Sequence, residues 1–237
     1  MKKHPKPSFA DADRAIYVDF EGLGTPNALP VLLGSHWVDD AGNAHRVQYV
    51  FDPRLEGAAL ARTPEKGGTC EYVGSLDAAL AKVCGVAEME DRLIVEWSKH
   101  EEDVVRRETA DTMLASVFLT RVRDAKDDAK PWKREHHDHI AFRPNDRGQK
   151  NCLPNFMELA GMPYPKILKG AARPLRHVLD QIERRGRYKS VTKEAKRDWS
   201  HLLAHNAVDC EGTRLVLMTA CAEMESPRSP QMLEGPR

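Results

Sequence analysis

The sequence predicts a layered α/β domain, with a mixed central sheet flanked by helices. Short apolar runs that alternate like strands are followed by longer segments with apolar residues at helical spacing, in the order β-β-β-α-β-α. The 237 residues are enough for one large domain with a real core. Apolar residues make up 41% and charged residues 30%, which is typical of a folded soluble chain.

The first three predicted strands form an antiparallel meander. Ala15–Asp19 is a short buried run, Leu29–Asp39 is a longer apolar run, and His45–Phe51 alternates polar with apolar residues. The last two are separated by the turn sequence DDAGN, which favours a hairpin.

A helix and a strand follow, and then a second helix. Ser75 is a good N-cap for a helix that runs to about Ala87. Arg92–Trp97 has the composition of a buried strand, and Ser98 is a candidate cap for a helix over Lys99–Val117.

The second half of the chain is predicted to be mostly helical. Residues 121–150 are polar, highly charged and interrupted by prolines, so we expect a surface insertion there. Three helices are predicted after it: Leu153–Gly161, Pro174–Arg185 and Lys193–Met224. Residues 14–225 are expected to form one domain, between a loose basic leader over residues 1–13 and a flexible tail over residues 226–237.

Composition also bears on the compartment. No apolar run is long enough to span a bilayer, and the basic N-terminus lacks the apolar stretch of a signal peptide. The five cysteines are an odd number without a CxxC pair, which argues against a disulfide scaffold or a zinc ribbon. We therefore expect a cytoplasmic protein with no membrane partner, and the sequence does not identify its protein partners.

The charges are unevenly distributed although the formal net charge is zero. Residues 71–111 carry a balance of −6, whereas residues 166–197 carry +8. A basic segment of this kind is either a solvated helix face or a surface for an anionic partner.

Two carboxylates at the end of the first strand pose a problem. Asp19 and Glu21 are two residues apart, so in a strand their side chains point the same way and repel. They are either an ordinary pair facing water at the strand end or ligands for a hard divalent cation.

Two further groups of residues could complete such a site. On the last predicted helix His205 and Asp209 are four residues apart and share a face, either as an ion pair or as part of a site. Three acids, Glu101, Glu102 and Asp103, follow the fourth predicted strand and open a helix, where the helix dipole alone would favour them.

Together the three segments resemble the DEDD exonuclease superfamily, which has a ribonuclease H-like fold. The nearest branch is a group of bacterial predicted nucleases whose last motif reads Tyr-Asn-x-x-Asp-Cys-x-x-Thr, similar to HNAVDCEGT over His205–Thr213. WSKHE, ending at Glu101, resembles the second motif of that branch, and LPNFMELAGMPYP resembles its helix and turn. His205 occupies the spacing normally held by the tyrosine.

The resemblance implies a metal-dependent hydrolase, most simply a 3′–5′ exonuclease acting on the 3′ end of single-stranded DNA or RNA. Two Mg²⁺ or Mn²⁺ ions would be held by Asp19, Glu21 and Asp209, with Glu101 reaching the second ion directly or through water. Glu102 and Asp103 are rivals for the place of Glu101. His205 would orient or deprotonate the attacking water, or would serve only as the ion-pair partner of Asp209.

The resemblance also favours the basic segment as a contact for the phosphate backbone. Candidate contacts are Lys169, Arg173, Arg176, Arg187 and Lys189. Four aromatic residues are candidates for base stacking or for ordinary packing: Trp132, Tyr164, Tyr188 and Trp199.

Other functions stay open at this point. A non-catalytic nucleic-acid-binding or scaffolding module could use the same fold, and an endonuclease or a nucleotide-processing enzyme could use the same site. The run His136–His139 invites a zinc interpretation, but adjacent ligands rarely close a tetrahedral site.

Overall fold

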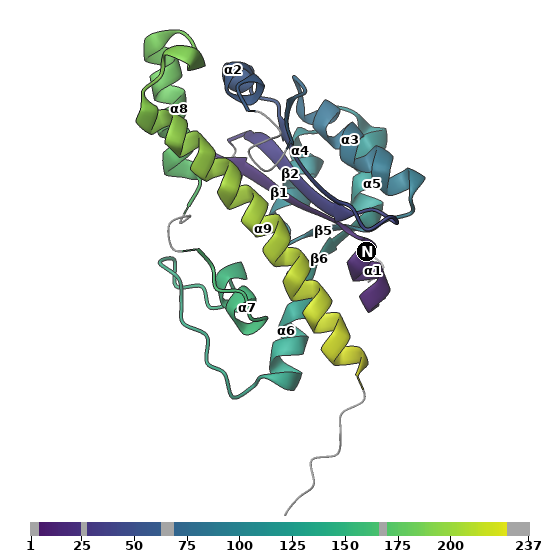
Figure 1. Cartoon of the computed structure of the whole chain (residues 1–237). Helices are drawn as coiled ribbons and strands as arrows, with labels where there is room; N and C mark the ends of the chain where they lie inside the picture. Colours follow the sequence, from purple (N-terminus) through teal and green to yellow (C-terminus); the bar gives the residue numbers. More distant parts are fainter. Residues whose placement is uncertain (1–4, 25–27, 63–68, 166–169, 227–237) are drawn as a thin grey trace, which may run out of the picture.

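The computed structural model of the chain describes residues 5–24, 28–62, 69–165 and 170–226, which form a six-stranded mixed sheet with helices on both faces (Figure 1). The strands lie in the order β4-β3-β2-β1-β5-β6. Their bounds are β1 Ile16–Gly22, β2 Pro30–Val38, β3 Ala44–Val50, β4 Thr69–Tyr72, β5 Ile94–Glu96 and β6 Val122–Asp124. The helices are α1 Phe9–Arg14, η1 Pro53–Leu55, α2 Glu56–Leu60, α3 Leu76–Met89, α4 His100–Glu108, α5 Thr112–Arg121, α6 Ala125–His136, α7 Leu153–Leu159, α8 Ala172–Arg185, η4 Tyr188–Ser190 and α9 Lys193–Glu225.

The predicted meander is confirmed, because β1 pairs antiparallel with β2 and β2 pairs antiparallel with β3. On the other side of β1, β5 and then β6 join in parallel. The edge strand β4 pairs in parallel with β3. Neither β4 nor β6 was predicted, since each is only three or four residues long and has no clear alternation.

Alternation along β1 divides the core between the two faces of the sheet. Ile16, Val18 and Phe20 belong to the buried cluster that also includes residues of α3 and α5. Tyr17 packs on the opposite face against Cys210 and other residues of α9. Because side chains two apart point the same way, Asp19 and Glu21 lie on the face that α9 covers.

The long helix α9 organises this second layer. Thr192 caps its N-terminus, and its buried residues run the length of the helix from Ala195 to Cys221. It crosses the sheet diagonally, with α8 beside its first half and α6 and α7 beside its second half (Figure 1). The predicted boundaries of α8 and α9 agree with the structure to within two residues.

The sequence predicted a loose leader over residues 1–13. In the structure, residues 9–13 instead belong to the helix α1. Ser8 and Asp11 form a capping box that starts α1, and Ala12 is fully buried. The Sγ of Cys221 lies 3.4 Å from the carbonyl oxygen of Pro7, so the segment is attached to the end of α9. The basic composition concealed this short helix.

The single helix predicted over Lys99–Val117 is also wrong, since the structure has two helices, α4 and α5. The break falls at Thr109–Asp111, where the carboxylate of Asp77 accepts hydrogen bonds from the backbone of Ala110 and Asp111. Asp111 then caps α5 by accepting from Met113 and Leu114. Lys99, rather than Ser98, is the N-cap of α4.

The surface insertion predicted over residues 121–150 is wrong in its first half. Asp124 ends β6 and caps α6, an amphipathic helix whose buried side includes Ala125, Ala129 and Trp132. These residues follow helical spacing, but the abundance of charge and an internal proline, Pro131, obscured the pattern. Residues 137–152 contain no helix or strand.

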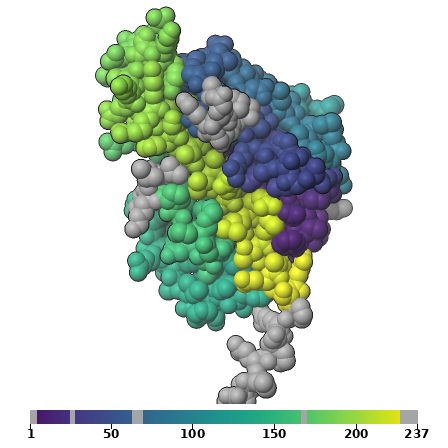
Figure 2. Space-filling model, in the orientation of Figure 1, coloured from purple at the N-terminus to yellow at the C-terminus, as the bar shows by residue number. Residues whose placement is uncertain are grey.

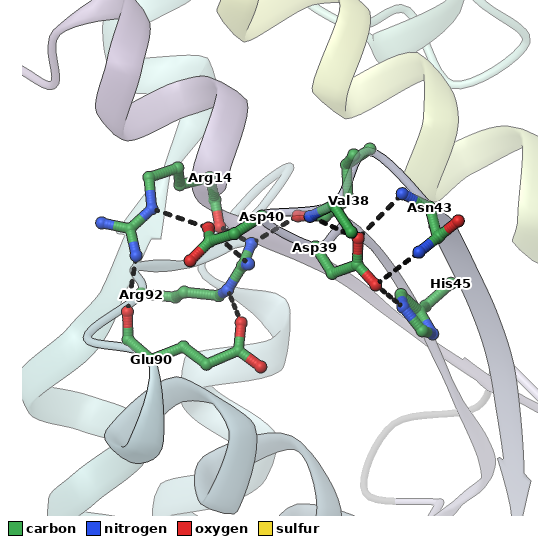
Figure 3. Close-up of polar contacts among 9 residues, drawn as sticks. Arg14, Val38, Asp39, Asp40, Asn43, His45, Glu90 and Arg92 are labelled. Carbon is green, nitrogen blue, oxygen red and sulfur yellow. Dashed lines mark hydrogen bonds and ion pairs between the residues drawn. The ribbon is translucent and has the colours of Figure 1, made fainter.

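At the N-terminal ends of β1 and β5 a buried arginine joins three elements (Figure 3). Arg92 is 1% exposed and donates through Nε to Glu90 at 2.5 Å. Its Nη1 donates to the carbonyl oxygens of Arg14 at 2.6 Å and Val38 at 2.7 Å, and its Nη2 lies 3.6 Å from Asp40. The guanidinium therefore connects the end of α3, the start of β1 and the end of β2.

No helix in the described residues has the length and apolar character needed to cross a membrane. The predicted tail lies, from residue 227 on, outside the described residues.

Candidate active site

The carboxylates of β1 do not form a pair that faces water at the strand end. Glu21 is 6% exposed, and Asp19 is partly buried beneath α9. Asp19 Oδ2 accepts a hydrogen bond of 2.9 Å from Asn206 of α9. Glu21 Oε1 lies 3.6 Å from His205 Nε2. Both side chains therefore point toward the middle of α9, as the cation-site interpretation requires.

Asn206 is the neutral residue that fixes Asp19. It is fully buried, and its Nδ2 donates to both the carbonyl oxygen and the carboxylate of Asp19 at 2.9 Å. Its Oδ1 accepts from Gln48 at 3.2 Å. Gly34, the β2 partner of Asp19, makes room for it, since a Cβ there would lie 1.9 Å from Asn206 Oδ1. The motif HNAVDC contained this residue, but its role depends on the close approach of helix and sheet.

Of the three acids that open α4, Glu101 is the one the fold brings to β1. It is 4% exposed, and its Oε1 lies 3.5 Å from the backbone nitrogen of Phe20. Glu102 instead pairs with Arg106 at 2.6 Å on the helix surface, and Asp103 is exposed. Burial thus separates the three residues, which are equivalent in the sequence.

Glu96 is a fourth buried acid on this side of the molecule that the sequence analysis did not identify. It is the last residue of β5 and is 0% exposed. Its Oε2 accepts from the backbone nitrogen of Glu102 at 2.8 Å, which satisfies one free N–H at the start of α4. Its Oε1 has no hydrogen-bond partner among the described residues. The available signal was an acid directly after the apolar residues Leu93–Val95 of RLIVEW.

Tyr164 enters the site from the segment between α7 and α8. Its hydroxyl lies 2.8 Å from Asp209 Oδ1 and 2.5 Å from His205 Nδ1. The ring meets the imidazole edge to face, with centroids 6.1 Å apart. The sequence analysis took Tyr164 for a stacking or packing residue. Tyr164 and His205 are 41 positions apart in the chain, and no local sequence pattern predicts that they lie side by side.

His205 lies among acidic groups on one side and Tyr164 on the other. Its Nε2 is 3.6 Å from Glu21 Oε1 and 3.7 Å from Asp209 Oδ2. The His205 and Asp209 side chains are 16% and 20% exposed, so both are accessible from solvent. The spacing of four residues places them on one face of α9, as the sequence predicts.

Burial raises the pKa of every acid in this group, and repulsion from neighbouring acids adds to this for Asp19, Glu21, Glu96 and Glu101. The pKa of Asp19 is raised by burial and by the charges of Asp209 and Glu101, and that of Glu21 is raised by burial and by Asp19. Burial and Glu96 raise the pKa of Glu101, and burial raises the pKa of Asp209. Burial raises the pKa of Glu96 to about 8.

Buried carboxylates normally have cationic partners. In the part of the chain that the structure describes, no lysine or arginine forms an ion pair with Asp19, Glu21, Glu96, Glu101 or Asp209. Within the same residues, buried oxygens of Glu21, Glu96 and Glu101 have no hydrogen-bond partner. Since carboxylate oxygens are the preferred ligands of Mg²⁺ and Mn²⁺, the donor set fits a divalent cation.

A metal site whose ligands are already in place is a stricter condition than a set of suitable donor atoms. Among the described residues, no group of three or more His, Cys, Asp or Glu side chains is already arranged to hold an ion. The zinc interpretation of residues 136–139 gains no support, because His137 Nε2 instead contacts Glu223 at 2.9 Å. Glu223 also accepts from Trp132 Nε1 at 2.8 Å, which ties α6 to the end of α9.

The basic segment lies on α8 and the residues that follow it. Arg173, Arg176, Arg187 and Lys189 are exposed, and Lys169 lies outside the described residues. Figure 2 shows α8 and the start of α9, in green, as a projecting lobe. Of the aromatic candidates, Trp132 and Trp199 are core residues at 0% and 1% exposure, so neither is a stacking platform. Tyr188 is half-buried and packs against the core between α8 and α9.

The site thus consists of acids from β1, β5, α4 and α9, with an imidazole, an amide and a phenol around them. This set can bind divalent cations, and it places a potential proton acceptor beside them. A scan against protein-family models, a search of curated proteins and a search of solved structures each find no significant match for this chain.

Proposed function

We propose that this protein is a divalent-metal-dependent nuclease, a hydrolase that acts on DNA or RNA as a 3′–5′ exonuclease of the DEDD type. The observation that carries the proposal is the convergence of Asp19, Glu21, Glu101 and Asp209 from three separate elements, without lysine or arginine partners among the described residues. Gathering buried acids in this way costs stability unless cations neutralise them. A cation site is the function that explains this arrangement.

The arrangement of the sheet supports a ribonuclease H-like fold. The resemblance implies an antiparallel meander of three strands joined to parallel strands, and the sheet has β1–β3 in that arrangement with β5 and β6 parallel to β1. β4 is an additional edge strand. The first motif lies on β1, next to the parallel half of the sheet.

In this proposal Asp19, Glu21, Glu101 and Asp209 would hold two Mg²⁺ or Mn²⁺ ions. When bound, such ions activate water and stabilise the leaving oxygen of a phosphodiester. Asn206 holds the Asp19 carboxylate in place, and Glu96 fixes the first turn of α4 beneath Glu101. His205 Nε2 is the proton acceptor available for the attacking water.

The exposed basic residues of α8 and its neighbours give the single-stranded backbone an electrostatic surface. Replacing Arg173, Arg176, Arg187 or Lys189 by glutamine should weaken binding to all sequences alike. Each contact removed should reduce the slope of log affinity against log salt by about 0.7 for a single strand.

The test is a cleavage assay with 5′-labelled single-stranded DNA and RNA in Mg²⁺, Mn²⁺ or EDTA. We expect a ladder that shortens from the 3′ end, lost in EDTA and in Asp19→Asn. Asp127→Asn, which changes an exposed aspartate of α6, is the matched control and should cleave normally.

Tight binding without cleavage in either metal would reject the nuclease and favour a non-catalytic binding module. Internal cuts without a ladder would assign an endonuclease to the same site. Release of small products from free nucleotides alone would assign a nucleotide-processing enzyme.

A further inference from the structure

We propose that Tyr164 is a positioning residue that fixes the tautomer of His205, so that Nδ1 carries the proton and Nε2 presents its lone pair to the acidic site. The inference rests on the proposed function for the role of Nε2. The hydrogen-bond pattern behind it can be measured independently of activity.

The Tyr164 hydroxyl has two close neighbours but only one proton to donate. A phenol has one O–H hydrogen, so Tyr164 can donate to only one of its two close neighbours and must accept from the other or leave it unpaired. The neighbours are Asp209 Oδ1 at 2.8 Å and His205 Nδ1 at 2.5 Å. An ionised carboxylate can only accept, so Tyr164 donates to Asp209 when Asp209 serves as a cation ligand.

His205 Nδ1 must then be the donor to the Tyr164 oxygen. In a neutral imidazole only one ring nitrogen carries a proton, and the hydrogen bond made by one nitrogen determines the state of the other. Nε2 is therefore left with its lone pair, and it lies 3.6 Å from Glu21 Oε1 and 3.7 Å from Asp209 Oδ2. When Nε2 takes the proton of the attacking water, the resulting imidazolium keeps its Nδ1–H bond to Tyr164.

Packing gives Tyr164 the rigidity this role requires. Its ring packs against the buried cluster formed by α6, α7 and the second half of α9. Gly212 allows α7 to approach α9 closely, since a Cβ there would lie 2.3 Å from Met157 Sδ. An ordinary phenol has a pKa of about 10, so the hydroxyl keeps its proton at neutral pH.

This arrangement also accounts for the departure from the tyrosine motif. The position four residues before Asp209 holds His205 instead of tyrosine, and a tyrosine hydroxyl from a different segment contacts both residues. The phenol acts through the imidazole instead of contacting the substrate.

The first experiment reads the tautomer directly. Protein labelled with ¹⁵N in its histidine rings is examined by long-range ¹H–¹⁵N correlation with saturating Mg²⁺, at about pH 8.5, well above the ordinary histidine pKa. His205→Gln identifies the signal. We expect the Nδ1–H tautomer in the wild type and a shift toward Nε2–H in Tyr164→Phe, which keeps the ring but loses the oxygen. Tyr72→Phe on β4 is the matched control and should leave the spectrum unchanged.

The second experiment uses kinetics. In Tyr164→Phe we expect kcat to fall by about 10–100-fold, the usual cost of removing a group that supports a catalytic residue, with KM nearly unchanged. An Nε2–H tautomer in the wild type, or a tautomer unaffected by Tyr164→Phe, would overturn the inference even if the protein cleaves nucleic acid. The expected tautomers without cleavage of any substrate would instead reject the proposed function and with it the catalytic role of Nε2.

Discussion

Arg92 and Glu96 lie at opposite ends of β5, and both side chains are buried, but their charges are compensated very differently. The guanidinium of Arg92 has Glu90, Asp40 and two backbone carbonyls around it (Figure 3). Among the described residues, Glu96 has one backbone N–H on one oxygen and no hydrogen-bond partner on the other. The charge of Arg92 is compensated by two carboxylates, although its Nη2 makes no hydrogen bond, whereas the charge of Glu96 is surrounded by the further acids Glu101, Asp19 and Glu21.

The difference indicates which end serves structure and which serves function. A buried charge with opposite charges and carbonyl groups around it connects elements, and removing it leaves those partners unsatisfied. Buried acids that raise one another's pKa store unfavourable energy that a ligand can release. Under the proposed function, the same sheet has a structural end and a cation-binding end, and the following predictions separate them by the sign of their effects.

The largest effect is expected for Asp19→Asn. Cleavage should fall below detection, while the protein without divalent cation should become more stable at pH 8, because burial and the charges of Asp209 and Glu101 raise the pKa of Asp19 and asparagine removes its buried charge. Urea unfolding in EDTA measures the gain, and the labelled-substrate assay measures the loss. A less stable Asp19→Asn protein would mean that the acidic end is structural after all.

At the other end, Arg92→Met should destabilise the fold by about 3–5 kcal/mol, since it removes the cation from a buried network and leaves Glu90 and two carbonyls behind. Arg14→Met is the control, because Arg14 is half exposed and its surface ion pair is worth at most about 1 kcal/mol. Denaturant midpoints compare the two variants. Equal losses of unfolding free energy in the two variants would show that the buried Arg92 contributes no more to stability than the surface residue Arg14.

The third prediction concerns pH and metal together. A carboxyl group whose pKa is raised on folding contributes most to stability at low pH, and the contribution is lost as pH rises through the folded pKa. For Glu96 this window runs from the ordinary glutamate pKa of 4.5 to the raised pKa of about 8. In EDTA we therefore expect thermal stability to fall between these values.

Mg²⁺ should reverse the loss at the upper end of the window, by about 2.7 kcal/mol at a hundredfold excess over its dissociation constant. Sodium chloride at equal ionic strength is the control for screening. Stability that is flat with pH and indifferent to Mg²⁺ would count against the acidic end as a cation site.

The sequence predicted those parts of the site that depend on local pattern. Asp19 and Glu21 follow an apolar run, and His205 and Asp209 repeat at helical spacing, so the two-residue and 3.6-residue periods were enough to place them. Glu101 could not be separated from Glu102 and Asp103, because only burial against β1 distinguishes them.

The residues that sequence analysis missed depend on contacts between distant segments. Tyr164 reaches His205 across 41 positions, and Asn206 reaches Asp19 across 187. The same limit applies to the fold, where α8 shows a clean amphipathic period while the charge of α6 hid its buried side. Tertiary packing decides such cases, and local pattern does not record it.

The smallest expected effect concerns Gly34, which makes room for Asn206, the neutral residue that holds Asp19. Alanine in the middle of a strand or helix is normally better than glycine by about 0.5–1 kcal/mol, and Gly85→Ala in α3, where a Cβ meets nothing within 4 Å, should show that gain. Gly34→Ala should have the opposite sign and cost about 1–3 kcal/mol, because its Cβ would lie 1.9 Å from Asn206 Oδ1.

A double-mutant cycle identifies the cause of that cost. If Gly34 exists to admit Asn206, then Gly34→Ala should be much less destabilising in an Asn206→Ala background, and the coupling should appear in the unfolding free energy. Mg²⁺ affinity should fall in both single variants, since each disturbs the hydrogen bond that holds Asp19. Additive stability effects with unchanged Mg²⁺ affinity would show that helix packing, rather than the orientation of Asp19, is what the glycine serves.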